Sequence, residues 1–210
     1  MSPRTRAAAM KLERLRRDAA TCRNCDLWER ATQTVFGEGN PVADIMLVGE
    51  QPGDREDLAG KPFVGPAGAV LDRALEQAGI DRSDVYVTNA VKHFRWEQRG
   101  KRRIHKKPTV RQINACRPWL DEEIAVTQPK LIVCLGATAA RALLGAQFRL
   151  TQHRGEIVEG DGLPPMTATI HPSAVLRAED DDREDQMAGL ISDLRSAAEY
   201  VNARRVSAAG

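Results

Sequence analysis

The chain has 210 residues, 42% of them hydrophobic, with 31 Lys and Arg against 29 Asp and Glu. This length and apolar content predict one domain over residues 1–210, with a core from about 22 to 203, and argue against two large domains. No segment approaches the roughly 18 consecutive apolar residues of a membrane-spanning helix, and the N-terminus lacks the apolar stretch of a secretory signal, so we expect a cytoplasmic monomer without a membrane partner.

The basic charge is concentrated in one segment. Lys92 to Arg111 holds nine Lys or Arg and one acidic residue, Glu97, so this segment carries +8 and the rest of the chain −6. Such a block is either a solvated mobile loop or a site for a polyanion. A compact cluster of this kind suits nucleic acid, whose phosphates bind it without sequence specificity. The run from Glu179 to Asp185 carries −5 and is expected to avoid phosphate.

The first half of the chain predicts two strands and two helices. Residues 7–20 have helix-forming composition, and residues 44–48 form an apolar strand. A long loop with five glycines follows, up to Gly68. Residues 69–78 place their apolar side chains on one helical stripe, and residues 85–91 predict the second strand.

The second half continues the alternation of strands and helices. After the basic block we predict a helix over 110–126, a buried strand over 131–135, a helix over 137–145, a strand over 166–170 and a final helix over 184–203. This order predicts an α/β fold, a three-layer α/β/α sandwich with a mostly parallel central sheet and right-handed crossovers. Ligands bind such sheets beyond the carboxyl ends of the strands, where the segments GEQPG, TNAVKH and HPS lie.

Cys22, Cys25, Cys116 and Cys134 are the four cysteines. A cytosolic protein keeps them reduced. The Cys22-x-x-Cys25 spacing is typical of metal ligands and of thioredoxin-like redox pairs, but its place before the first strand counts against the redox interpretation. Cys134 is flanked by Ile132, Val133 and Leu135 and is expected to be a small buried hydrophobe.

A metal site would need more donors than the Cys22–Cys25 pair. Cys116 lies early in a predicted helix, and His93 follows the second strand, so these two side chains are the candidates. Zinc and an iron–sulfur cluster are both compatible with three cysteines and one histidine.

Six motifs in a fixed order resemble the uracil-DNA glycosylase superfamily, in particular its iron–sulfur branch, family 4. They are the C-x-x-C pair, FGEGNP (36–41), GEQPG (49–53), GKPFVGPAG (60–68), VTNAVK (87–92) and HPS (171–173). The resemblance covers the chain from Cys22 to the last helix. It implies the glycosylase-like α/β/α fold, a 4Fe-4S cluster and uracil-containing DNA, single- or double-stranded, as substrate.

Three departures from the family 4 pattern resemble the UdgX-type glycosylases, which become covalently joined to their DNA. His93 stands where family 4 usually has a cysteine, the next segment contains KRRIH (101–105), and GEQPG replaces GEGPG. In that group three cysteines and one histidine hold the cluster. The resemblance therefore implies Cys22, Cys25, His93 and Cys116 as ligands.

The resemblance also implies roles in binding the base. A glycosylase turns the base out of the stack into a pocket, where its edge and its face are both read. Phe63 resembles the residue that stacks on the base, although a Phe there could also anchor the loop. Asn89 can offer a donor and an acceptor to uracil, or simply form a turn. His171 resembles the donor to a uracil oxygen, and Gln51 is expected to line the base pocket.

The remaining roles concern the sugar and the phosphates. The resemblance implies that Glu50 is the carboxylate near the sugar, where positive charge develops as the bond breaks. His105, carried by the basic segment, is a competent nucleophile once a carboxylate accepts its proton. Asp54 and Asp57 are expected to shape their loop or place water. The expected DNA-backbone contacts are Lys101, Arg102, Arg103, Lys106, Lys107 and Arg177.

Three functions follow from these features. The first is a uracil excision enzyme that ends as a covalent adduct through His105. The second is an ordinary multiple-turnover glycosylase in which His105 contacts phosphate. The third is a non-enzymatic nucleic-acid binding module in which Cys22, Cys25, His93 and Cys116 hold zinc.

Overall fold

The computed structural model describes residues 1–159 and 162–207 of the chain. Its centre is a five-stranded sheet in the order β1-β3-β2-β6-β7. The strands are β1 (Glu38–Gly39), β2 (Ile45–Gly49), β3 (Val85–Asn89), β6 (Leu131–Leu135) and β7 (Met166–Thr169). Only the edge strand β1 pairs antiparallel, and the other pairings are parallel. The α/β fold with a mostly parallel sheet is thus confirmed.

The central strands are buried because their side chains alternate between two apolar layers. In β2, Leu47 packs into one layer and Met46 and Val48 into the other. Cys134 of β6 lies in the second layer with no exposed surface, as expected of a small hydrophobe. A strand covered on both faces is a continuous apolar run, which is why the sequence predicted β6 correctly.

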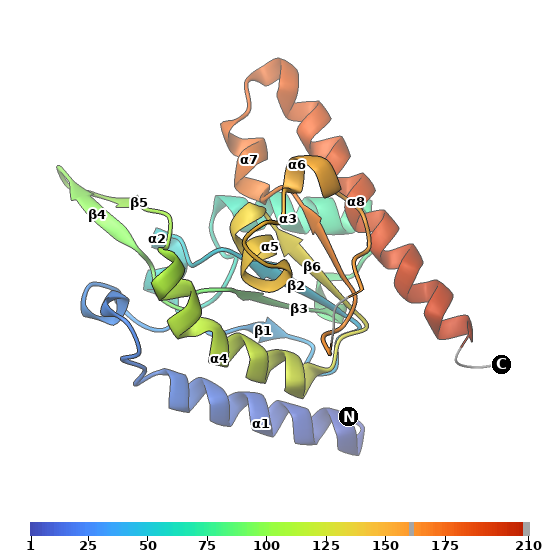
Figure 1. Cartoon of the computed structure of the whole chain (residues 1–210), viewed down its shortest axis with the longest axis horizontal. Coiled ribbons are helices and arrows are strands. Elements are labelled where there is room, and N and C mark those ends of the chain that lie inside the picture. The colour runs from blue at the N-terminus through green and yellow to red at the C-terminus, as the bar shows by residue number, and fades with distance from the viewer. Residues whose placement is uncertain (160–161, 208–210) are drawn as a thin grey trace.

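Helices cover both faces of the sheet (Figure 1). One face packs against α3 (Pro66–Gln77), α7 (Pro172–Arg177) and α8 (Asp180–Ser207). The other packs against α1 (Pro3–Ala19), α4 (Val110–Thr127) and α5 (Ala137–Leu144). The predicted helices are all present, with boundaries that differ by a few residues. In the part of the chain that the structure describes, no helix has both the length and the apolar character to cross a membrane.

Helix α1 begins earlier than predicted because Ser2 caps it and Pro3 opens it. Helix α3 also starts on a proline, Pro66. Helix α4 begins at Val110 behind Thr109, whose hydroxyl accepts from the backbone N–H of Gln112 while the Gln112 side chain accepts from the backbone of Thr109. This reciprocal capping fixes where the chain leaves the basic segment.

The middle of the basic segment forms a β-hairpin, which was not predicted from the sequence. Strand β4 (Trp96–Arg99) pairs antiparallel with β5 (Arg102–His105), and Trp96 faces His105 across the pair. Gly100 takes a φ of +58° at the first position of the two-residue turn. In Figure 1 the hairpin projects from the body of the protein near α2 (Asp54–Ala59).

Several short elements were not predicted. They are α2, α7, α6 (Leu150–His153), and two 3-10 turns at Asp26–Glu29 and Arg82–Asp84. Each is only one or two turns long, too short to carry a helical periodicity. Helix α2 divides the glycine-rich loop after β2, and α7 begins at Pro172, inside the HPS segment.

Candidate active site

A cavity of about 770 Å³ opens at the carboxyl ends of the parallel strands. Glu50 and Asn89 reach it from the ends of β2 and β3, and His171 follows β7. Phe63 comes from the loop before α3, and His105 from the end of the hairpin. The cavity thus brings together segments that lie far apart in the sequence. Its predicted site residues are Glu50, Gln51, Phe63, Asn89, His105, Lys107, His171 and Arg177.

Asn89 lines the cavity, and its side-chain oxygen accepts no hydrogen bond. Only 2% of this residue is exposed, and its Oδ1 has no hydrogen-bond partner. A Cβ added to Gly49 would lie 2.4 Å from that oxygen and 2.7 Å from the ring of Phe63. Glycine at this position therefore leaves room for both side chains. An unpaired buried oxygen is costly, so its presence points to a ligand that donates to it.

Phe63 is held in an unfavourable backbone conformation. Its φ is +55°, in the left-handed region that residues with a Cβ avoid. Gly68 makes this possible, because a Cβ there would lie 1.8 Å from the Phe63 carbonyl oxygen. Strain of this kind is concentrated at functional sites. The ring stacks on His171 with centroids 5.9 Å apart, so the two rings form one wall.

His171 caps the N-terminus of α7 and lines the cavity. Burial lowers the pKa of His171 to about 4, and the proximity of Arg177 and of the His105 ring lowers it further. The backbone N–H of Ser173 donates to Nδ1 at 3.1 Å. Since Nδ1 accepts this bond, the single proton of the neutral ring resides on Nε2.

The ring of His105 lies beside the carboxylate of Glu50 in the cavity. Its Nε2 lies 3.4 Å from Glu50 Oε1, and half of its side chain is exposed. Burial lowers the pKa of His105, Glu50 raises it, and Arg177 lowers it, with a net lowering. The imidazole is therefore neutral at physiological pH and carries a lone pair, next to a carboxylate that can accept its proton.

Gln51 lines the cavity, but its side-chain amide is committed to the hairpin. Its Nε2 donates to the carbonyl oxygens of Arg95 and Lys106 at 3.2 and 3.1 Å, and its Oε1 accepts from the backbone N–H of Arg95 at 3.1 Å. Gln51 thus ties the two ends of the hairpin to the end of β2. The structure places this amide on the hairpin and leaves only the Gln51 backbone for a base.

Arg103 is mostly buried and paired with acidic side chains, so it is not part of an exposed basic surface. Its guanidinium donates to Asp54 and Asp57, each at 2.6 Å, and only 18% of its side chain is exposed. Asp57 is fully buried and also accepts from the backbone N–H of Thr32. The expected phosphate contact by Arg103 does not match this arrangement. The contacts of Asp54 and Asp57 fit the expected shaping of their loop, and neither side chain lines the cavity. The three side chains latch the hairpin onto α2.

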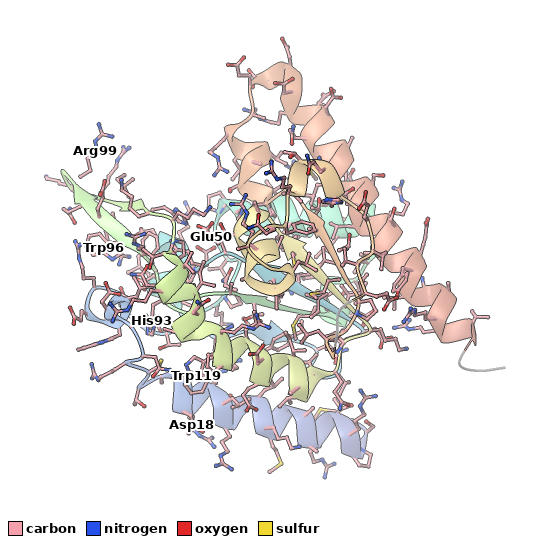
Figure 2. All side chains as sticks on the ribbon, viewed as in Figure 1. Asp18, Glu50, His93, Trp96, Arg99 and Trp119 are labelled. Carbon is pink, nitrogen blue, oxygen red and sulfur yellow. The ribbon has the colours of Figure 1, made fainter. Side chains whose placement is uncertain are left out.

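The other side chains predicted to contact phosphate differ in their exposure and in their pairing with acidic residues. Lys101 and Arg102 are exposed at the hairpin turn, next to Arg99, which Figure 2 shows at its outer end. Lys106 pairs with Glu97 at 2.7 Å. Lys107 and Arg177 line the cavity.

Two buried networks, one at the cavity wall and one behind Asn89, had no sequence signal. Glu56 accepts from the backbone N–H groups of Gly53 and Gly65 at 3.1 and 2.7 Å, which ties both ends of the glycine-rich loop together. Lys92 pairs with Glu123, and their side chains are 1% and 0% exposed. The Lys92 ammonium also donates to the carbonyl oxygen of Asn89 at 2.7 Å. The sequence alone does not show that an acid or a lysine is buried, because the partner that pairs with it lies far away along the chain.

The predicted metal ligands gather near the end of α1, away from the cavity. Cys22 accepts from the indole N–H of Trp119 at 3.1 Å, and Cys116 accepts from the backbone N–H of Lys92 at 3.2 Å. His93 and Cys22 line the same small hollow of about 110 Å³. Figure 2 shows His93 and Trp119 in this region. Burial raises the pKa of Cys116 to about 12, and the nearby thiols of Cys22 and Cys25 add to this.

Within residues 1–159 and 162–207, no three His, Cys, Asp or Glu side chains are grouped tightly enough to hold a single metal ion. A single zinc ion would need four donors at about 2.0–2.3 Å from it. A four-iron cluster spreads its ligands more widely, and N–H groups directed at the sulfurs are among the features that tune it. The chemistry of this donor set fits such a cluster.

Comparisons with known proteins identify the family of this chain. A family model described as the uracil DNA glycosylase superfamily matches residues 36–195. Type-4 uracil-DNA glycosylases of Pyrobaculum aerophilum and Thermotoga maritima are 34% and 38% identical, over 80% and 74% of this chain and 86% and 78% of theirs. That of Sulfurisphaera tokodaii is 38% identical over 69% of this chain, which spans 65% of that relative. The chain therefore belongs to the uracil-DNA glycosylase superfamily.

Proposed function

We propose that this protein excises uracil from DNA and then becomes covalently joined to the resulting abasic sugar through His105. The observation that carries the proposal is the pair formed by His105 Nε2 and Glu50 Oε1, 3.4 Å apart in the cavity that also holds Asn89. In a glycosylase that uses water as its nucleophile, the imidazole has no need to lie beside this carboxylate.

Recognition of uracil uses Asn89 and Phe63. The free Oδ1 of Asn89 accepts from the N3–H of uracil, and its amide nitrogen can donate to a uracil oxygen. The ring of Phe63 covers the face of the base. The strained backbone at Phe63 fixes this ring before DNA binds, so binding does not carry the entropy cost of ordering the Phe63 side chain.

Cleavage of the C1′–N1 bond leaves the electron pair on uracil. His171 donates from Nε2 to a uracil oxygen and stabilises the developing charge. A neutral imidazole suits this task because a proton on Nε2 is retained without repelling the positive charge that grows on the sugar. The Glu50 carboxylate stabilises that positive charge.

The sugar cation then reacts with His105. Nε2 passes its proton to Glu50, and the electron pair of that N–H bond forms the new bond to C1′ of the cation. Uracil departs with the electron pair and takes up the proton. The products are neutral uracil and an imidazole substituted at Nε2, so protons and electrons balance. A tethered imidazole outcompetes water because effective molarities reach on the order of 10⁵ M or more.

Cys22, Cys25, His93 and Cys116 would hold the 4Fe-4S cluster. When bound, the cluster supplies a structural link between the segment after α1, the segment after β3 and helix α4. Lys92 stands between it and the base pocket, because its backbone N–H contacts Cys116 and its side chain contacts Asn89. The cluster thus supports the segment that presents Asn89.

Removal of a cysteine tests this ligand set. We expect Cys116→Ala to lose the brown colour, the iron and the sulfide together, and to unfold at lower denaturant, because metal binding is coupled to folding. Cys134→Ala is the matched control, since Cys134 is buried in β6 among apolar side chains. A colourless Cys134→Ala protein with its fold intact would contradict the assignment. Iron and sulfide analysis with urea unfolding measures both effects.

Removal of the Asn89 amide tests recognition of the base. Asn89→Ala is expected to slow uracil release by roughly 100-fold or more, because the hydrogen bonds to uracil are lost in a buried site. Binding to undamaged DNA and its salt dependence should stay unchanged, since phosphate contact is separate from base contact. Lys101→Ala is the opposite control: its plot of log K against log salt should become shallower, with a slope smaller in magnitude by roughly one. A changed salt slope in Asn89→Ala would contradict this division.

An ordinary multiple-turnover glycosylase is the second candidate, favoured by the type-4 relatives. Incubation with a uracil-containing oligonucleotide, without any reductant, separates the two. The proposal expects one stoichiometric protein–DNA band that survives boiling in detergent on a denaturing gel. Free abasic DNA in excess over protein, without that band, would establish the ordinary glycosylase instead.

A further inference from the structure

The side chain of His93 has a single hydrogen-bond partner in the part of the chain that the structure describes. Its Nε2 lies 2.9 Å from the hydroxyl oxygen of Thr34, and the residue is only 6% exposed. The two segments are also joined by their backbones, because the N–H of Val35 donates to the carbonyl oxygen of Lys92 at 2.8 Å. Thr34 is therefore held beside the ring by the fold, although 59 positions separate the two residues.

The direction of the bond between Thr34 and His93 follows from a second contact of the same hydroxyl. Thr34 Oγ1 donates to the carbonyl oxygen of Ala19, the last residue of α1, at 2.9 Å. A hydroxyl has one proton and a carbonyl oxygen can only accept, so that proton is already used. Thr34 Oγ1 must then accept from His93, and Nε2 of the ring carries the proton.

This bond decides which nitrogen of His93 is available to iron. A histidine ligand binds a metal through the ring nitrogen without a proton, and the hydrogen bond made by the other nitrogen fixes that choice. With Nε2–H donated to Thr34, the available nitrogen is Nδ1. The sulfurs of Cys22 and Cys116 each receive an N–H group, whereas His93 gives its N–H to an acceptor. An acceptor in this position makes the imidazole a stronger donor to a metal.

We propose that Thr34 is a positioning residue of the 4Fe-4S site, which accepts the Nε2–H of His93 and so leaves Nδ1 as the atom that binds iron. The inference rests on the proposed role of His93 as a cluster ligand. It adds the ligand atom and the residue that selects it. Through the carbonyl oxygen of Ala19, the same hydroxyl also ties the end of α1 to the histidine after β3.

Thr34→Val removes the hydroxyl and keeps the shape of the side chain. We expect this variant to lose its cluster to excess EDTA roughly tenfold faster than the parent, because partners of metal ligands contribute 10–100-fold to metal affinity. Thr34→Ser keeps the hydroxyl and should lose the cluster at the parental rate. Thr21→Val is the matched control, since Thr21 lines the same hollow but its hydroxyl donates to the carbonyl oxygen of Asp18. Anaerobic fading of the cluster absorbance measures each rate, and a parental rate for Thr34→Val would overturn the proposal.

A double-variant cycle separates this role from a purely structural one. Thr34→Val also removes the hydrogen bond to Ala19, which could loosen the segment without acting on the histidine. His93→Cys replaces the imidazole by a ligand without an N–H group. In that background Thr34→Val should change the rate of cluster loss by less than about twofold, because Thr34 no longer has a proton to accept. A tenfold effect in both backgrounds would show that Thr34 acts through the fold alone and would overturn the proposal.

Isotope labelling of the unaltered protein tests the ligand atom directly. Two samples are made with histidine carrying ¹⁵N at Nδ1 or at Nε2, and each cluster is reduced with dithionite for electron–nuclear double resonance. The Nδ1 label should give the large hyperfine coupling of a nitrogen bound to iron, and the Nε2 label only a weak one. Of the other histidines, His105 and His171 line the cavity and His153 lies on α6, away from the cluster ligands.

A large coupling from the Nε2 label would overturn the assignment, and so would the absence of a large coupling from both labels. Neither the chelation assay nor the resonance experiment contains DNA. Their results therefore decide the role of Thr34 independently of uracil release and of any adduct through His105.

Discussion

Replacing His105 by serine is expected to abolish the heat-stable adduct while uracil is still released. The base pocket of Asn89, Phe63 and His171 remains intact in this variant, and the space left by the imidazole admits water to the sugar. We therefore expect the adduct to fall below detection on a denaturing gel. Uracil release in a single turnover should stay within roughly tenfold of the parent, because the bond to the base breaks before or as the nucleophile arrives.

His153→Ser is the matched control for this experiment. His153 lies on α6, pairs with Glu156 at 2.8 Å and does not line the cavity, so its replacement should leave the adduct unchanged. Glu50→Gln should instead reduce adduct formation, since the amide cannot take the proton from Nε2 of His105. A heat-stable complex formed by His105→Ser on uracil-DNA would place the nucleophile elsewhere and refute the central proposal.

Replacing Lys92 by methionine is expected to cost about 3–5 kcal/mol of unfolding free energy. The ammonium is buried against Glu123, and breaking such a pair from one side leaves an uncompensated charge in the core. Glu123 would keep the hydrogen bonds from the backbone of Gly37 and the hydroxyl of Tyr86, each 2.9 Å, but these cannot neutralise it. Urea unfolding, followed by circular dichroism, measures the loss.

An exposed pair provides the comparison. Lys61 lies 3.4 Å from Glu38 with 60% of its side chain exposed, so Lys61→Met should change stability by less than about 0.5 kcal/mol. Adding Glu123→Gln to Lys92→Met should recover part of the loss, because the buried charge is then gone. Equal stability of the Lys92 and Lys61 variants would show that the buried pair contributes no more than a surface one.

The sheet and the ends of its strands could be predicted from the sequence because they obey local rules. The run 131–135 is apolar throughout, and the structure shows a strand over the same residues. Asn89 and His171 follow such strands, so the α/β fold alone places them at one edge of the sheet. The position of Glu50 after β2 follows from the same argument.

The hairpin and the buried networks could not be predicted, because they depend on partners far along the chain. Strands β4 and β5 are polar and mostly exposed, with no alternation to mark them. Their attachment to the body depends on Gln51 and on the pairing of Arg103 with Asp57, 46 positions away. Lys92 likewise resembles a surface residue until the fold brings Glu123 to it from α4.

The hairpin also fixes the number of residues between Arg103 and His105. Side chains on a strand alternate between its faces, and Arg103 and His105 are two residues apart, so the latch and the nucleophile turn toward the body together. One residue inserted between them would turn one of the two outward, and two residues would move them about 7 Å further apart. The length of the strand between Arg103 and His105 is therefore constrained, because a change there would separate the pairing that holds the hairpin from the imidazole beside Glu50.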